Sequence, residues 1–410
     1  MSANYEQLKK SNLSGSTIYS DEPLQVKQPD GRIVYKQANY VAVDDKREIT
    51  SVNPQTSVPT TLNNASIDFN IDNGLTDVLQ YASLNINLTN NTGANATLVA
   101  SPLWIDRIQI FGQNGSNMLL DFYGEELYQQ FLFLDRYTYE SQASAVGLST
   151  TTYNSIGAIV ADGTSVEMNI PIYQFFKAIH FATGCLTSPL LLRVKFRSTA
   201  MTHITGTAMT LSSIELVVRG KNLKSYAMEK LKDRYSPHSR IPMSLSFLLI
   251  DRMPVNQNLV ASQTFQITLN GLRGICSYLM FTIRLTSNLA SPTAQLNYIR
   301  MLNWDILDSS NSSLIGSHRR QLNTQQLDWS NNYGNEAWNQ KQFHIMSWSA
   351  NPRGAFSDGV DLGHALLTGN EKLSVTCPST LASGAYTIDI YAYCHANLVS
   401  EKGVLKIERD

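Results

Sequence analysis

Hydrophobic and polar residues alternate along most of the chain with a period of two. Ile67, Phe69 and Ile71 are separated by polar residues, and the same pattern recurs at 84–88, 190–197, 214–218, 265–269, 281–285 and 388–390. Successive side chains of a strand point to opposite faces of a sheet. Such alternation is therefore typical of antiparallel strands with one buried and one solvated face. The pattern predicts an all-β protein.

Helical periodicity is confined to short segments. Residues 125–134 are long enough for about two to three turns, and 172–181 shows weaker helical spacing directly after Pro171. Apolar residues also recur at helical spacing between 223 and 233, and Pro237 follows soon afterwards. Because proline ends a helix, we expect a connector helix near 223–233 between two halves of the chain.

The two halves resemble each other in sequence. A shift of 197 positions without gaps places the residues 73–75 (NGL) on 270–272 (NGL) and Tyr81 on Tyr278. The alternating residues at 84–88 then coincide with those at 281–285, and 214–216 (IEL) resembles 388–390 (IDI). Since chance strand matches share only the alternation, the shared turn and tyrosine indicate two copies of one β domain.

The length of each copy favours a particular architecture. Residues 62–235 and 236–410 each span roughly 175 residues, which suits eight strands of about 6 residues with generous loops. Two face-to-face sheets of four strands form a jelly roll, whereas an immunoglobulin-like sandwich needs only about 100 residues. We predict two tandem eight-stranded jelly rolls, preceded by a polar N-terminal arm at residues 1–61.

Composition narrows the choice of function. Lys and Arg total 32 and Asp and Glu total 33, so the net charge is −1 and gives no basic surplus for coating nucleic acid. Charged residues make up only 16%, which suits a surface that packs against copies of itself. The sequence has no apolar run of membrane-spanning length and its first ten residues lack a signal-peptide core.

The residues of the usual catalytic and metal sites form no motif in this sequence. HExxH, GxSxG and GxxxxGK[ST] are absent, so we predict no catalytic, cofactor-binding or metal-binding residues and no enzymatic activity. A sugar-active enzyme would need paired carboxylates in one cleft. The scattered Cys185, Cys276, Cys377 and Cys394 form no CxxC pair and are expected to be plain buried thiols.

Four segments resemble a known family. Residues 102–110 (PLWIDRIQI) with 119–125 (LLDFYGE) are similar to early strands of the first jelly roll in double jelly-roll major capsid proteins of icosahedral double-stranded DNA viruses. Residues 169–176 (NIPIYQFF) with 188–192 (SPLLL), the loop from 351–352 to 357–362 (SDGVDL), and 391–398 (YAYCHANL) resemble later segments of that family in the same order.

The resemblance implies a structural role in a virion. A chain with two jelly rolls forms a homotrimer with six, and this pseudo-hexagonal capsomer tiles an icosahedral capsid, commonly over an internal membrane. The implied partners are neighbouring capsomers, minor capsid or penton proteins, cement proteins and an internal viral membrane, without direct sequence-specific binding of nucleic acid. Assembly is then expected in the host cytoplasm or elsewhere in the cell interior.

Two groups of lysines are candidate contact residues. Lys9 and Lys10 lie in the arm, and Lys224, Lys230 and Lys232 lie in the expected connector helix. Basic clusters of this kind contact anionic lipid headgroups or acidic neighbours, or they simply form a solvated helix face. Both interpretations stay open for the two groups.

Four of the five tryptophans gather in the second half, at Trp304, Trp329, Trp338 and Trp348. Aromatic faces among Asn and Gln side chains suit sugar stacking, which gives the alternative function of a receptor- or glycan-binding spike or minor capsid protein. Apolar anchors of a long loop, or aromatic contacts within an interface, explain the same cluster.

Overall fold

The computed structural model describes most of both halves of the chain. It covers residues 45–112, 115–132, 159–172, 183–198, 209–223, 228–229, 243–291, 294, 297–301, 303–314, 318–319, 344–348, 364–401 and 404–409. Four short strands precede this part, namely β1 (Thr17–Ile18), β2 (Pro23–Lys27), β3 (Ile33–Gln37) and β4 (Val41–Ala42), with β1 paired to β4 and β2 to β3.

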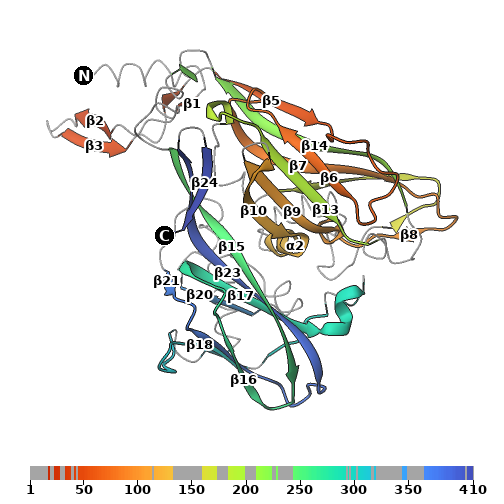
Figure 1. Cartoon of the computed structure of the whole chain (residues 1–410), viewed down its shortest axis with the longest axis vertical. Helices are drawn as coiled ribbons and strands as arrows, with labels where there is room; N and C mark the ends of the chain where they lie inside the picture. The colour runs from red at the N-terminus through yellow and green to blue at the C-terminus, as the bar shows by residue number, and fades with distance from the viewer. Residues whose placement is uncertain are drawn as a thin grey trace.

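The first half forms two antiparallel sheets of four strands each (Figure 1). One sheet has the order β12-β7-β14-β5 and the other β10-β9-β13-β6. In chain order the strands are β5 (Asp45–Val52), β6 (Ser66–Ile71), β7 (Val78–Thr89), β9 (Ile105–Gly112), β10 (Asn117–Tyr123), β12 (Ser165–Pro171), β13 (Leu190–Phe196) and β14 (Thr210–Leu223). The short strands β8 (Ala96–Thr97) and β11 (Ile159–Val160) pair beside them.

The second half repeats this arrangement, with sheets in the orders β15-β23-β17-β20 and β16-β22-β18-β19. Its strands are β15 (Met243–Leu259), β16 (Thr264–Thr268), β17 (Gly274–Leu285), β18 (Asn303–Leu307), β19 (His318–Arg319), β20 (His344–Ser347), β22 (Lys372–Thr376) and β23 (Gly384–Glu401). β21 (Ala365–Leu367) pairs with β17, and the final strand β24 (Val404–Arg409) pairs with β23.

Strand order confirms the duplication predicted from the sequence. When the eight strands of each half are numbered in chain order, both halves contain one sheet ordered 1-8-3-6 and one ordered 2-7-4-5. The third strands, β7 and β17, coincide under the shift of 197 residues, and each has a bulge at the equivalent position, Gln80 and Ser277. The fold is therefore two tandem jelly rolls in one all-β chain, as predicted.

The first jelly roll begins earlier in the chain than the sequence indicates. The expected arm extends to residue 61, yet β5 forms the edge of a four-stranded sheet and places Thr50 and Val52 opposite Val218 and Leu216 of β14. The charged start of this strand, residues 45–48 (DKRE), hides its alternation. The first jelly roll therefore includes residues 45–52.

Helices are short, as expected for a jelly roll. The predicted helix at 125–134 is α2 (Gly124–Leu132), and single 3₁₀ turns lie at Ser101–Trp104, Thr183–Cys185 and Thr286–Ala290. Leu223 is the last residue of β14, so the connector helix does not begin there. Met228 and Glu229 are helical. The rest of the connector, and residues 173–181 of the helix expected at 172–181, lie outside the described residues.

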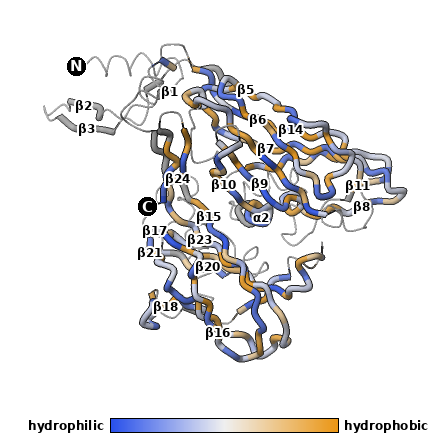
Figure 2. The backbone as a smooth tube through the Cα atoms, viewed as in Figure 1, coloured by the Kyte–Doolittle hydropathy of each residue, from blue (hydrophilic) through white to orange (hydrophobic). Residues whose placement is uncertain are grey.

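Apolar side chains form two hydrophobic cores. One core lies within the second jelly roll, between its two sheets. The other fills the first jelly roll and continues onto the outer face of the second, where Tyr278, Met280, Tyr391 and Tyr393 belong to it. The alternation of apolar and polar residues along the strands is visible in Figure 2. The two jelly rolls therefore share a core instead of meeting only through a linker.

Candidate functional site

The surface between the two jelly rolls contains a group of buried charged side chains that contact one another. Helix α2 of the first jelly roll faces strands β15, β23 and β17 of the second (Figure 1). Close approach at the start of this helix depends on Gly124, because a Cβ there would lie 2.2 Å from the carbonyl oxygen of Pro102. This glycine sets the position of the helix, and the helix in turn carries Glu125 to the second jelly roll.

Apolar and aromatic side chains make up most of this interface. Tyr278 and Tyr393 stack with ring centroids 4.0 Å apart, and both rings are buried in the core that also contains Leu127 and Tyr128 of α2. Aromatic rings bury large areas, and stacked pairs add stabilisation beyond that area. The outer face of the second jelly roll is thus apolar where a solvated face is usual for an antiparallel sheet.

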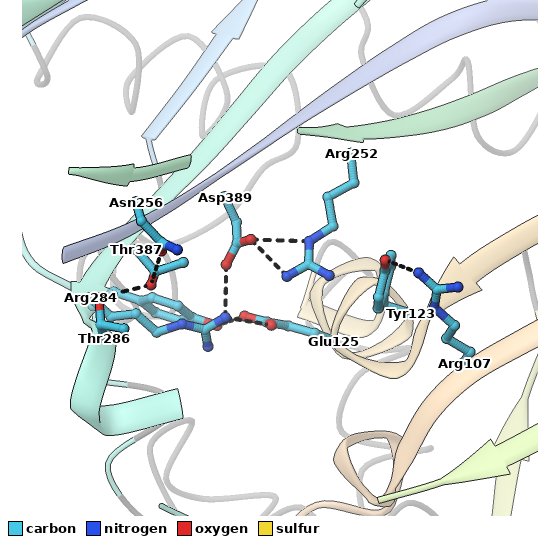
Figure 3. Close-up of polar contacts among 10 residues, drawn as sticks. Arg107, Tyr123, Glu125, Arg252, Asn256, Arg284, Thr286, Thr387 and Asp389 are labelled. Carbon is cyan, nitrogen blue, oxygen red and sulfur yellow. Dashed lines mark hydrogen bonds and ion pairs between the residues drawn. The ribbon is translucent and has the colours of Figure 1, made fainter. Parts of the chain in front are cut away.

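Four charged side chains lie within this apolar surface (Figure 3). One Nη of Arg284 is 2.8 Å from Oε2 of Glu125 and 2.8 Å from Oδ2 of Asp389. Arg252 binds the other oxygen of Asp389 at 2.7 Å. The side chains of Glu125, Arg284 and Asp389 are 3%, 2% and 0% exposed. Two positive and two negative charges thus balance inside the interface.

Hydrogen bonds and a cation–π contact extend this cluster on both sides. Tyr298 donates its hydroxyl to Oε1 of Glu125 at 2.5 Å. The guanidinium of Arg252 lies 4.0 Å from the ring centroid of Tyr123 in the first jelly roll, whose hydroxyl accepts a hydrogen bond from Arg107. At the far end of the interface, the side-chain amide of Asn117 donates to the carbonyl of Leu405 at 2.8 Å. The polar contacts thus join the two jelly rolls at several points.

The electrostatics favour the charged forms of Glu125 and Arg284. Burial alone would raise the pKa of Glu125, but the charge and hydrogen bond of Arg284 outweigh it and lower that pKa to about 2. Burial alone would lower the pKa of Arg284, yet Glu125 raises it above its usual value. Taking such charges out of water is costly, and removing one partner leaves the others uncompensated.

The pKa of Glu126, the next residue of α2, is shifted in the opposite direction to that of Glu125. Burial raises the pKa of Glu126 well above its usual value, since the charge of Arg252 only partly offsets the loss of water. Its Oε2 atom has no hydrogen-bond partner within the described part of the chain. Adjacent residues of one helix therefore carry a charged and a neutral carboxyl group at the same interface.

The lysines singled out in the sequence cannot be placed. Lys9, Lys10, Lys224, Lys230 and Lys232 all lie outside the described residues, so their contacts stay predictions. The structure instead brings together Glu125, Arg252, Arg284 and Asp389, which the sequence analysis did not select as site residues. Arg252, Arg284 and Asp389 are charges within largely apolar strands, whereas Glu125 lies in the first turn of α2. The sequence cannot distinguish such positions from an ordinary solvated face.

The tryptophan cluster is only partly described. Trp304 lies on β18 at 2% exposure within the core of the second jelly roll, where its ring meets Phe281 and His344 edge-on at 6.0 and 4.9 Å. Trp348 packs against the same core and is half-buried. Trp329 and Trp338 lie outside the described residues. The two tryptophans that are placed serve as core anchors.

The described residues contain neither a candidate metal site nor a candidate membrane-spanning helix. No group of three or more His, Cys, Asp and Glu side chains is arranged to hold a metal ion there. In that same part of the chain, none of the helices has the length and apolar character needed to cross a bilayer.

Sequence comparison finds no match, either to a protein-family model or to a curated protein. Structural comparison does find similar proteins. The PBCV-1 virus capsid structure superposes with a TM-score of 0.68 at 12% identity, over 92% of this chain and 99% of that chain. The Faustovirus major capsid protein gives 0.63 at 11% identity over 87% and 91% of the two chains. This chain has the fold of viral major capsid proteins.

The similarity extends to a further capsid protein of this fold. The mavirus major capsid protein superposes with a TM-score of 0.52 at 10% identity, over 88% of this chain and 90% of that chain. Because the matched regions cover nearly the whole length of both chains, the double jelly roll includes both halves and their arrangement. At such low identity, strand order and packing are what these proteins have in common.

Proposed function

We propose that this chain is a major capsid protein that self-assembles into an icosahedral virion. The observation that carries the proposal is the double jelly-roll fold, matched over nearly its whole length by viral capsid proteins. The shared core and buried ion cluster between the two jelly rolls support the same role. A shell subunit needs a fixed shape, and both features hold its two halves as one rigid block. Its mechanism is thus assembly, without catalysis.

The building block that we propose is a homotrimer. Three copies supply six jelly rolls, which gives a threefold assembly a nearly hexagonal outline. The internal duplication suggests which surface takes part. In the second jelly roll the outer face of sheet β15-β23-β17-β20 is covered by the first jelly roll, and Thr282 and Asp389 on this face are fully buried.

The equivalent face of the first jelly roll is open in the isolated chain. Asn85 and Glu215 occupy the positions that Thr282 and Asp389 occupy in the second, and Asn85 donates to Glu215 and to Glu167 at 3.2 and 2.8 Å. Ile49 on the same face is 69% exposed. We propose that the second jelly roll of a neighbouring copy covers this face. Head-to-tail contacts of this kind close into rings.

Oligomeric state tests the proposed assembly. Native mass spectrometry of the purified chain should give trimers, because obligate interfaces bury roughly 2,000 Å² or more. Ile49→Asp with Glu215→Arg should produce monomers, since the first change places a charge in the proposed contact and the second reverses one. Ser66→Arg is the matched control, because Ser66 is exposed on the other sheet of the first jelly roll, which is not part of the proposed contact face. A wild-type chain that stays monomeric at micromolar concentration contradicts the proposal.

The remaining partners follow from the same role. We propose neighbouring capsomers, minor capsid or penton proteins, cement proteins and an internal viral membrane as partners, with assembly in the interior of the host cell. Images of purified particles with hexagonal capsomers, in which this chain is the most abundant protein, are the expected result. Few copies per particle would instead favour a spike or minor capsid protein. The described tryptophans do not favour the glycan-binding alternative, because Trp304 is buried.

A further inference from the structure

Two of the four cysteines lie directly opposite each other on neighbouring strands. Cys276 of β17 is the register partner of Cys394 of β23, and both side chains are buried. The two thiols are within hydrogen-bonding reach of each other. Cys185 and Cys377 are also buried, but they lie on other elements. The sequence analysis treats all four as scattered thiols, and only the pairing of β17 with β23 brings this pair together.

The spacing of the pair suits a covalent bond. Directly opposed residues of antiparallel strands have Cα atoms about 4.5–5.5 Å apart, and disulfides form at Cα distances of about 4.4–6.8 Å. The bulge at Ser277 shapes the position, because Cys276 and Tyr278 pair with the consecutive residues Cys394 and Tyr393. Cys276 and Cys394 then face the core of the second jelly roll, while the two tyrosines face the first.

The first jelly roll shows that this position does not require a pair of thiols. Its equivalent residues beside the bulge at Gln80 are Leu79 and Gly220, which are also register partners. A Cβ on Gly220 would come within 2.6 Å of the side chain of Thr76. In the first jelly roll this position therefore holds the large side chain of Leu79 opposite a glycine, Gly220. Two small sulfur-bearing side chains fill it in the second.

We propose that Cys276 and Cys394 are a redox-active pair that forms an intramolecular disulfide. In the reaction, one thiolate attacks a small disulfide oxidant such as glutathione disulfide and releases one thiol. The second cysteine then attacks the mixed disulfide and releases the other. Two protein thiols and one glutathione disulfide thus give one protein disulfide and two glutathione molecules. This inference does not depend on the proposed capsid role.

The bond would fasten the third strand of the second jelly roll to its last. The Cys276–Cys394 link closes a loop that contains β18, β19, β20, β21 and β22. Closing a loop of this length restricts the unfolded chain and stabilises the folded state. Because burial raises the pKa of the Cys276 thiol, oxidation of the folded chain is expected to be slow, and oxidation during folding fast.

Thiol counting in a glutathione redox buffer tests the proposal. The full chain is incubated in its native state and, in parallel, refolded from denaturant in the same buffer, then alkylated under denaturing conditions. Intact mass should show that two of the four cysteines escape alkylation after refolding. Non-reducing digestion should yield one linked peptide pair containing Cys276 and Cys394. The melting temperature of the oxidised chain should exceed that of the reduced chain by about 5 °C or more.

Matched variants separate this pair from the other cysteines. Cys394→Ala should leave three alkylated thiols and abolish the thermal shift, whereas Cys185→Ser with Cys377→Ser should preserve both the link and the shift. Four alkylated thiols in both arms would overturn the proposal. So would linked peptides that contain mainly Cys185 or Cys377, or an oxidised chain with an unchanged melting temperature.

Discussion

Arg284 holds two carboxylates from different parts of the chain at the interface between the jelly rolls. Its contacts to Glu125 and Asp389 are both 2.8 Å long and almost fully buried. No solvent is available to compensate either acid if the guanidinium is removed. The contribution of this residue is therefore best measured by the cost of deleting it.

Substituting Arg284 tests that argument. Arg284→Met keeps much of the side-chain volume but leaves Glu125 buried without its ion-pair partner and Asp389 with Arg252 alone, so the free energy of unfolding should fall by about 3–5 kcal/mol. Chemical denaturation measures the change. Arg193→Met is the control, because the Arg193–Asp68 pair is 36% and 22% exposed and should contribute less than about 1 kcal/mol. Similar losses in both variants would contradict the assigned role.

Glu125 and Glu126 should affect stability with opposite dependence on pH. The pKa of Glu125 falls from 4.5 to about 2 on folding. Its stabilisation is therefore present above 4.5 and is lost as pH falls towards 2. The pKa of Glu126 rises on folding. Its neutral form therefore favours the folded state below 4.5, and stability is lost as pH rises through the folded value.

Two amide variants measure this difference. Glu126→Gln keeps a neutral group at the site, so at neutral pH it should be as stable as the wild type or more stable, and its stability should decline less as pH rises. Glu125→Gln should be less stable than the wild type at neutral pH, because Arg284 loses a charged partner. Denaturation curves recorded across pH supply the comparison. A loss of stability at neutral pH in both variants would refute the assignment for Glu126.

At the scale of single elements, helix α2 depends on the backbone approach at Gly124. Alanine favours helices over glycine by about 1 kcal/mol, so Gly124→Ala would stabilise a helix in open space. Here its Cβ would lie 2.2 Å and 2.3 Å from the carbonyl oxygens of Pro102 and Ile105. We expect a net loss of about 1–3 kcal/mol in unfolding free energy. Gly74→Ala, where nothing lies within 4 Å, should be close to neutral.

The strands show what sequence pattern can and cannot predict. Alternation located β6, β7, β13, β14, β16, β17 and β23 because apolar and polar residues alternate along at least part of each strand. The shifted repeat located the duplication. Alternation did not reveal β5, because the first four residues of this strand are all charged. The interface cluster was missed for a related reason. Arg284 and Asp389 alternate with apolar residues as solvated side chains do, and their burial comes from a helix distant in sequence.

At the scale of the whole molecule, the shared core predicts that both jelly rolls unfold together. Trp104 is buried in the first jelly roll and Trp304 in the second. The fluorescence difference between wild type and Trp104→Phe therefore reports the first jelly roll alone. Its midpoint in denaturant should coincide with that of the remaining tryptophans, which lie in the second half. Two separate midpoints would indicate that the interface does not couple the jelly rolls.

The unequal outer faces of the two jelly rolls have an evolutionary consequence. If the two jelly rolls were copies of one separate polypeptide, every mutation would appear at all six positions of the proposed trimeric ring. A single chain that carries both jelly rolls is free of that constraint, because each jelly roll can change on its own. One jelly roll can then carry an apolar surface with a buried ion cluster for contact within the chain. The other can keep a polar outer face that suits contact with water until newly made chains assemble.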